Sequence, residues 1–152
     1  MDAIRDAIPH REPFLFVDEI VEQGPDVLRT RWRVPPEAEF LRGHYPGRPL
    51  VPGVILCESA FQAGAILCAR ELEGASPGAV PVLTRIGEAR FKRMVAPGET
   101  VECEVRLDQR VGPARYLTAR LAVGGKTVLR VEFTVAVTSA GASFDSAGAA
   151  IG

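Results

Sequence analysis

The sequence predicts an α+β fold in which an antiparallel sheet curls around one long helix. Residues 54–69 form a run that is apolar on nearly every face, a pattern typical of a buried helix. Four strand candidates follow this run in succession, and strands that follow one another along a chain pair most simply as an antiparallel sheet. Because the helix must bury its apolar surface, we expect the sheet to wrap around it.

Length and composition indicate a single domain. The chain has 152 residues, of which 47% are hydrophobic, enough for one domain with a sizeable core. Its net charge of -1 favours neither nucleic acid nor a membrane as a partner, although local basic patches can still exist. Residues 1–6 contain no apolar signal-peptide core, and no segment resembles a transmembrane span. We therefore expect a cytoplasmic protein.

The cysteines and histidines exclude several kinds of site. Cys57, Cys68 and Cys103 are odd in number and widely spaced in apolar patterns, which favours core residues over disulfides. Only two histidines, His10 and His44, are present, and no cluster has ligand spacing, so we expect no metal site. The sequence contains neither a phosphate-binding Gly-rich Lys motif nor a dinucleotide fingerprint, so we expect no cofactor.

The amino-terminal part predicts two strands and a helical turn. Residues 14–21 are an apolar run that indicates a strand or strand-like entry. Residues 27–34 alternate arginine with larger or less charged residues, the period-two pattern of a strand with one face in water. Two prolines end this strand, and residues 37–42 predict a helical turn.

After the helix, which should end near residues 73–74, the sequence predicts a loop and then the remaining strands. These strand candidates are residues 80–91, 100–109, 114–123 and 126–137. The pair Gly124-Gly125 indicates a hairpin turn. Residues 138–152 are rich in Gly, Ser and Ala without any period, so we expect a flexible tail after a domain of residues 1–137.

Residues 43–53 predict a shaped loop directly before the long helix. Three prolines and three glycines in this stretch fix some φ angles and free others, which excludes a helix there. The loop carries His44, and the helix that follows begins with backbone N–H groups, including those of Gly53 and Val54, that have no helical partner. A base and a site for developing negative charge are thereby placed side by side in the sequence.

Glu58 and Gln62 form a narrow polar stripe on the apolar helix. Their spacing of four residues places them on one helix face. Burial there would raise the pKa of the Glu58 carboxyl and favour the protonated acid; alternatively, Glu58 reaches solvent or caps a neighbouring element. Together with His44 and the helix start, an acid at Glu58 completes the set of groups that an elimination beside a carbonyl requires.

Three motifs resemble those of a known family. Gly-His-Tyr-Pro-Gly-Arg-Pro-Leu-Val-Pro-Gly-Val at residues 43–54, with Glu58 and Gln62, resembles the signature of the β-hydroxyacyl-acyl-carrier-protein dehydratases of bacterial fatty acid synthesis. Ile-Pro-His-Arg-Glu-Pro-Phe-Leu-Phe-Val-Asp at residues 8–18 is similar to the amino-terminal motif of that family, and residues 88–98 are similar to its later strand-and-turn motif. The three matches occur in family order.

The resemblance implies a hotdog fold, usually a homodimer whose sheets join and whose active sites lie between subunits. The implied reaction dehydrates a (3R)-hydroxyacyl thioester on acyl carrier protein to the trans-2-enoyl thioester, without metal or cofactor. In this reading His44 is the base, Glu58 protonates or orients the departing hydroxyl, and the Gly53 N–H polarises the carbonyl oxygen. Relatives that also isomerise the double bond carry Asp in place of Glu58, so the sequence favours the branch that only dehydrates.

Supporting roles follow from the same resemblance. Gln62 is expected to orient Glu58, while Val54 and Phe61 are candidates for a substrate tunnel or the core, with the core favoured. His10, between a proline and an arginine, is read as a structural hydrogen-bonding residue rather than a second catalyst.

A basic cluster is the candidate carrier-protein dock. Arg90, Lys92 and Arg93 lie near a proposed strand end, and acyl carrier proteins are acidic, so the cluster either docks them or is an ordinary solvated face. Two departures from the family pattern, Ser59 for a common alanine and Met94 for a common proline, bear on substrate detail. A hotdog thioesterase and a non-catalytic acyl-binding subunit are the alternatives, and the His44 loop argues against both.

Overall fold

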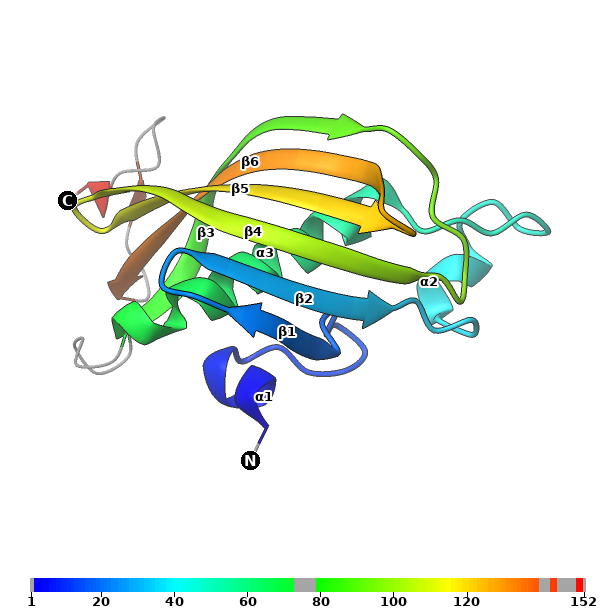
Figure 1. Cartoon of the computed structure of the whole chain (residues 1–152), viewed down its shortest axis with the longest axis horizontal. Coiled ribbons are helices and arrows are strands. Elements are labelled where there is room, and N and C mark those ends of the chain that lie inside the picture. The colour runs from blue at the N-terminus through cyan, green and yellow to red at the C-terminus, as the bar shows by residue number, and fades with distance from the viewer. Residues whose placement is uncertain (1, 73–78, 140–142, 145–149, 152) are drawn as a thin grey trace.

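The computed structural model describes residues 2–72, 79–139, 143–144 and 150–151 (Figure 1). Its helices are α1 (Ala3–Ala7), α2 (Glu39–Arg42) and α3 (Gly53–Cys68), with a 3-10 turn, η1 (Ala69–Leu72), after α3. Its strands are β1 (Glu19–Gln23), β2 (Val27–Arg33), β3 (Ala79–Phe91), β4 (Thr100–Val111), β5 (Ala114–Val123), β6 (Lys126–Ser139), β7 (Ser143–Phe144) and β8 (Ala150–Ile151).

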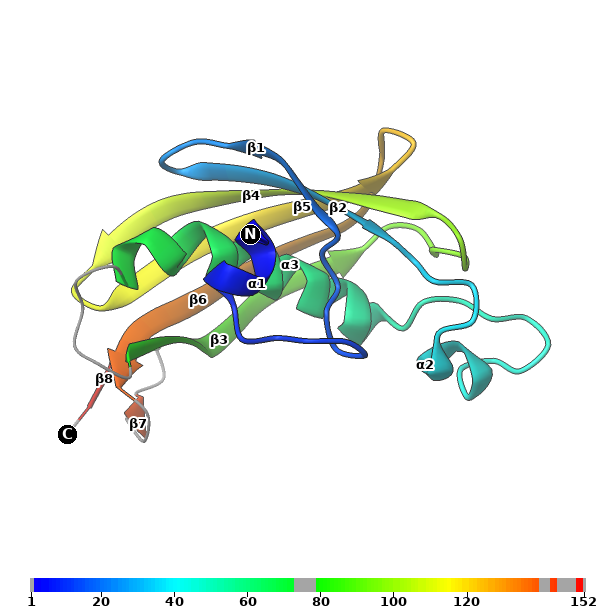
Figure 2. The same cartoon turned by 90° about the horizontal axis from the view of Figure 1, so that it is seen from below.

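Six strands form one antiparallel sheet in the order β1-β2-β4-β5-β6-β3. The sheet arches over α3, which lies along its concave face and contacts β2, β4, β5 and β6 (Figures 1 and 2). This arrangement confirms the predicted α+β hotdog fold.

Alternation along the strands determines which face covers the helix. In β4, Val101, Cys103 and Val105 are buried while the residues between them are charged, as the period of two requires. Val101 pairs with Trp32 of β2, which is also buried, so both strands turn their apolar side chains toward α3. The register thereby produces a continuous core.

The hairpin between β5 and β6 is a tight two-residue turn. Gly124 and Gly125 have φ of 57° and 80°, positive values that the primed hairpin turns demand and that glycine adopts at no steric cost. The predicted turn is confirmed.

The long helix belongs to the core. The span Gly53–Leu72 is apolar and long enough to cross a membrane, but 67% of its most apolar window is buried within the fold. A close approach between layers explains one of its glycines, because a Cβ on Gly64 would lie 2.7 Å from the ring of Phe133 in β6. Gly64 therefore lets the helix sit close to the sheet.

The prediction of a strand at residues 14–21 is wrong for residues 14–18, because β1 begins only at Glu19. The reason lies in the backbone groups of Phe16: its N–H donates to the side-chain oxygen of Gln62, and its carbonyl accepts from Ser59. Both groups are satisfied by side chains of α3, so this segment has no need of a neighbouring strand.

Both ends of the described chain contain elements that the sequence did not predict. The first residues form the short helix α1, whose N-terminus is capped by the Asp2 carboxylate. At the other end β6 runs to Ser139, two residues past the expected boundary, and β7 pairs with β8. The predicted flexibility of residues 138–152 stays a prediction, because 140–142, 145–149 and 152 lie outside the described residues.

Candidate active site

His44 lies at the start of the connection between α2 and α3, with a defined tautomer. Its Nδ1 is 3.0 Å from the backbone carbonyl oxygen of Leu50. A carbonyl oxygen can only accept a hydrogen bond, so the proton belongs on Nδ1 and the lone pair on Nε2. The imidazole therefore has a basic nitrogen available for proton abstraction.

The loop that carries His44 contains two residues with positive φ and is stabilised by backbone hydrogen bonds. Tyr45 has φ of 57° and Gly47 has φ of 83°, and the Arg48 N–H donates to the Tyr45 carbonyl at 3.0 Å. The Val51 N–H donates to the Val95 carbonyl at 2.8 Å, which ties the loop to the chain after β3. The predicted shaped loop is confirmed.

Glu58 lies on the second turn of α3 with its side chain 22% exposed. Two side chains approach the same carboxylate oxygen, Oε1: Gln62 Nε2 donates to it at 3.2 Å, and His10 Nε2 lies 3.6 Å away. The sequence spacing predicted the Gln62 contact. It missed the His10 contact, for which the only signal was that His10 falls within a recognised motif.

Gln62 and Ser59 attach α3 to the segment before β1. Both are buried. The Gln62 oxygen accepts from the Phe16 N–H at 2.8 Å, and its amide also lies 3.1 Å from the Phe14 carbonyl. Ser59 Oγ donates to the Phe16 carbonyl at 2.8 Å. The hydrogen bonds of Gln62 are thus divided between the Glu58 carboxylate and the chain that carries His10.

The start of α3 is open on one side. Gly53 is its first residue, and a Cβ there would lie 2.8 Å from the ring of Phe91, so glycine keeps the two segments close. Val54 is 74% exposed, and its expected place in the core is therefore wrong for the single chain. Phe61 does lie in the core, edge-to-face with Phe133 at a centroid distance of 4.9 Å.

His44 and Glu58 line different cavities. His44 lines one of about 580 Å³ together with residues of its loop and of the chain after β3, namely Tyr45, Arg48, Pro49, Leu50, Met94, Val95, Ala96 and Glu99. Glu58 lines one of about 90 Å³ together with His10, Phe61, Gln62, Ala65, Pro81, Leu83 and Val135. Neither cavity of the single chain holds both the candidate base and the candidate acid.

The outer edge of β3 is long and partly apolar. β3 ends the sheet and pairs with β6 on one side, and Leu83, Ile86 and Phe91 are exposed along it. An exposed apolar edge strand is a template for pairing with another chain. Leu83 also lines the cavity of Glu58, so this edge borders the candidate site.

The basic cluster lies exposed at the end of the same strand. Arg90 forms an ion pair with Glu88. Lys92 and Arg93 have no carboxylate within 4.0 Å among the described residues. The cluster thus presents two cations whose charge is not offset by a close partner.

The cysteines offer no nucleophile for an alternative chemistry. All three are free and buried. Burial raises the pKa of the Cys57 thiol, and it raises the pKa values of Cys68 and Cys103 to about 12, so each stays protonated near neutral pH. The predicted core role is confirmed for all three.

Sequence comparisons cover most of the chain. A family model described as the FabA-like domain matches residues 8–132. The 3-hydroxyacyl-[acyl-carrier-protein] dehydratase FabZ of Nitratidesulfovibrio vulgaris strain DP4 is 35% identical over 133 residues, 87% of this chain and 86% of the relative. The protein of the same name from Chloroflexus aggregans is 38% identical over 132 residues, 86% of this chain and 90% of the relative.

Solved structures agree on the fold. The dehydratase heterocomplex ApeI:P from Xenorhabdus doucetiae superposes with a TM-score of 0.75 at 11% identity, covering 90% of this chain and 91% of that chain. A hypothetical thioesterase from Streptococcus pneumoniae superposes with a TM-score of 0.62 at 13% identity, covering 80% and 85%. These TM-scores support a shared hotdog fold, but identities this low do not establish a family. The sequence comparisons do establish it: the chain belongs to the FabZ-like family of 3-hydroxyacyl-[acyl-carrier-protein] dehydratases.

Proposed function

We propose that the chain converts (3R)-3-hydroxyacyl thioesters on acyl carrier protein to trans-2-enoyl thioesters in fatty acid biosynthesis, in the cytoplasm. The observation that carries the proposal is the hydrogen bonding of the candidate base, His44, and of the candidate acid, Glu58. His44 has a free basic Nε2 because its Nδ1 faces the Leu50 carbonyl, and Glu58 is held at one oxygen by Gln62. The named FabZ relatives support the same reaction.

The chemistry follows from these positions. His44 Nε2 takes the proton from the carbon next to the thioester carbonyl, and negative charge develops on the carbonyl oxygen, where the Gly53 N–H stabilises it. Glu58 then gives its proton to the 3-hydroxyl, the carbon–oxygen bond breaks, and water departs. Proton transfer from the His44 imidazolium to the Glu58 carboxylate, directly or through water, restores both groups.

The working site is proposed to form between two copies of the chain. His44 and Glu58 line separate cavities in one chain, and β3 offers an unpaired edge beside Glu58. Pairing of two β3 edges about a two-fold axis would place one chain's His44 loop near its partner's Glu58, because an isologous interface brings the same two surfaces together twice.

The carrier protein is proposed to dock on the basic cluster. Lys92 and Arg93 are exposed and directly follow the end of β3. They lie on the chain that leads to Met94 and Val95, which line the His44 cavity. An acidic partner guided to these cations would deliver its thioester next to that cavity.

A product assay distinguishes dehydration from its competitors. Incubating the purified protein with a 3-hydroxyacyl thioester should produce the α,β-unsaturated thioester without release of thiol. Release of thiol would identify a thioesterase instead, and formation of neither product would identify a non-catalytic acyl-binding subunit.

A mixed dimer tests the shared site. A His44→Ala chain and a Glu58→Gln chain should each be inactive alone, whereas a dimer of the two collects both changes in one site and leaves the other intact. Co-expression with different affinity tags, followed by purification through both, should give dimers with about half the wild-type activity, by the symmetry of an isologous pair. Doubly tagged dimers as inactive as their parents would show that the site lies within one chain or that one role is wrong.

A further inference from the structure

We propose that His10 is a positioning residue that, with Gln62, holds one oxygen of the Glu58 carboxyl and leaves the other to deliver the proton. The inference rests on the proposed function, since it concerns the acid of that reaction. His10 comes from the chain before β1, whereas Glu58 and Gln62 come from α3.

Among the described residues, the polar contacts of the Glu58 carboxyl involve only one of its two oxygens. Gln62 Nε2 lies 3.2 Å and His10 Nε2 lies 3.6 Å from the same atom, Oε1. An oxygen that accepts a hydrogen bond from Gln62 and faces the His10 nitrogen is a poor place for a proton of its own, so in the acid form the proton belongs on Oε2. The oxygen that must protonate the departing hydroxyl is thereby selected by its neighbours.

The proton on His10 can also be placed. Its Nδ1 is buried and has no hydrogen-bond partner among the described residues. A proton there would be a buried donor without an acceptor, which is costly, whereas a proton on Nε2 faces the carboxylate. At 3.6 Å the contact with Glu58 is slightly longer than a hydrogen bond, and contacts of this kind tighten when substrate closes a site.

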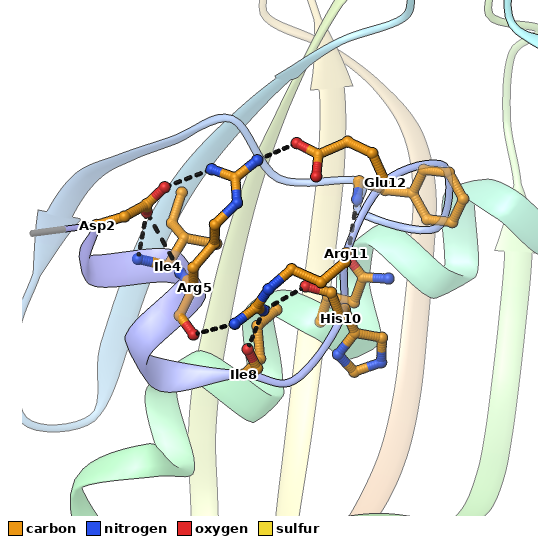
Figure 3. Close-up of polar contacts among 9 residues, drawn as sticks. Asp2, Ile4, Arg5, Ile8, His10, Arg11 and Glu12 are labelled. Atoms are coloured by element: carbon orange, nitrogen blue, oxygen red, sulfur yellow. Dashed lines mark hydrogen bonds and ion pairs between the residues drawn. The ribbon is translucent and has the colours of Figure 1, made fainter.

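The backbone around His10 is fixed by a network of arginine contacts (Figure 3). The Arg11 guanidinium donates to the carbonyl oxygens of Ile8 at 2.9 Å, of His10 at 2.6 Å and of Arg5 at 3.0 Å. Arg5 in turn pairs with Asp2 and Glu12. One guanidinium thus ties together three carbonyls of α1 and the chain after it, which holds His10 in place beside α3.

The ring of His10 has packing as well as polar contacts. It is stacked at 22° against Phe14 with a centroid distance of 6.4 Å. A purely structural His10 would act through this packing, and a positioning His10 acts through its N–H. Two substitutions separate these roles: His10→Phe keeps an aromatic ring against Phe14 and removes the donor, whereas His10→Gln removes the ring and keeps an N–H at a similar reach.

The kinetic experiment measures both variants on a 3-hydroxyacyl thioester at saturating and limiting concentrations. His10→Phe should lower kcat about tenfold while KM stays within about twofold, since one hydrogen bond to the acid is lost from the chemical step. His10→Gln should recover kcat to within about threefold of wild type on the same grounds. Full activity of His10→Phe, or a loss in His10→Gln as large as in His10→Phe, would overturn the proposal.

A second measurement does not depend on activity or on the folding of His10 variants. Because the chain has two histidines, ¹⁵N-histidine labelling gives two sets of ring signals, and His44→Ala assigns those of His10. Glu58→Gln in the full-length protein should shift the His10 Nε2 signal. An unmoved signal would overturn the contact even if the wild-type protein is an active dehydratase. A shifted signal, combined with a wild-type protein that has no dehydratase activity, would overturn the proposed function alone.

Discussion

The side-chain amide of Gln62 donates a hydrogen bond of 3.2 Å to the Glu58 carboxylate, one helical turn away, while its oxygen accepts one of 2.8 Å from the Phe16 N–H. A single buried side chain thus orients the candidate acid and anchors the chain before β1. Gln62 therefore serves both the stability of the fold and the geometry of the site.

Replacing Gln62 by methionine should be costly. Gln62→Met keeps most of the volume but leaves the buried Phe16 N–H without an acceptor, so the free energy of unfolding should fall by about 1–3 kcal/mol. Ser59→Ala, which removes only the donor to the Phe16 carbonyl, should cost less, about 1 kcal/mol. Urea unfolding of both variants checks the order, and a larger loss in Ser59→Ala would contradict it.

Removing the base should eliminate nearly all turnover without unfolding the protein. His44→Ala is expected to lower kcat by about 10²–10⁴-fold, the usual contribution of a positioned general base, with little change in Tm because His44 lies on a loop. Formation of the enoyl thioester can be followed by its absorbance. A variant that keeps most of its activity would exclude His44 as the base.

Replacing the acid by its amide should impair the chemical step more than binding. Glu58→Gln keeps the shape of the side chain but cannot deliver a proton, so kcat should fall while KM changes little. Steady-state kinetics at saturating substrate provide the measurement. Unchanged turnover under those conditions would refute the assigned role.

Charge reversal of the basic cluster should affect only carrier-bound substrate. Lys92→Glu with Arg93→Glu should raise KM for an acyl-carrier-protein thioester by roughly tenfold at low salt, and the effect should shrink as salt rises. A short soluble thioester should be turned over normally. Arg70→Glu, at the opposite end of α3, is the matched control, and equal effects on both substrates would argue against docking.

The ion-pair cluster around Glu71 should make stability depend on pH. Burial of Glu71 opposes ionisation, but hydrogen bonds from Arg110 and Arg115 outweigh it, so the pKa of Glu71 lies below its ordinary value. A lowered folded-state pKa gives stability that is present above the unfolded value, about 4.3, and is lost as pH falls through the folded value.

Glu71→Gln should therefore lower the free energy of unfolding by about 1 kcal/mol at pH 7. It should make little difference in acid, once the Glu71 carboxyl of the wild type is protonated in both the folded and the unfolded state. Urea midpoints measured at pH 7 and at successively lower pH values test this. Glu39→Gln removes an ion pair with Arg42 that is exposed on both sides and should be neutral throughout. A loss for Glu71→Gln that stays the same from pH 7 into acid would show that the ionised carboxylate contributes nothing.

The order of elements was readable from local patterns. Alternation at Val101, Cys103 and Val105, the apolar run of α3 and the Gly124-Gly125 turn each depend on neighbours a few residues away, and such local signals can be read without knowledge of the tertiary packing. The motif around His44 likewise placed a histidine on a loop before a helix start, and the structure contains that arrangement.

Tertiary structure decided the contacts between distant parts of the chain. Phe16 reaches Gln62 across 46 positions, which turned an apolar run expected to be a strand into a segment bound to a helix. His10 meets Glu58 only because that segment crosses α3. Val54 is 74% exposed although Cys57 and Phe61, three and seven residues further along the same helix, are buried. Periodicity records which residues are apolar or polar, whereas the partner that each one meets depends on how the layers pack.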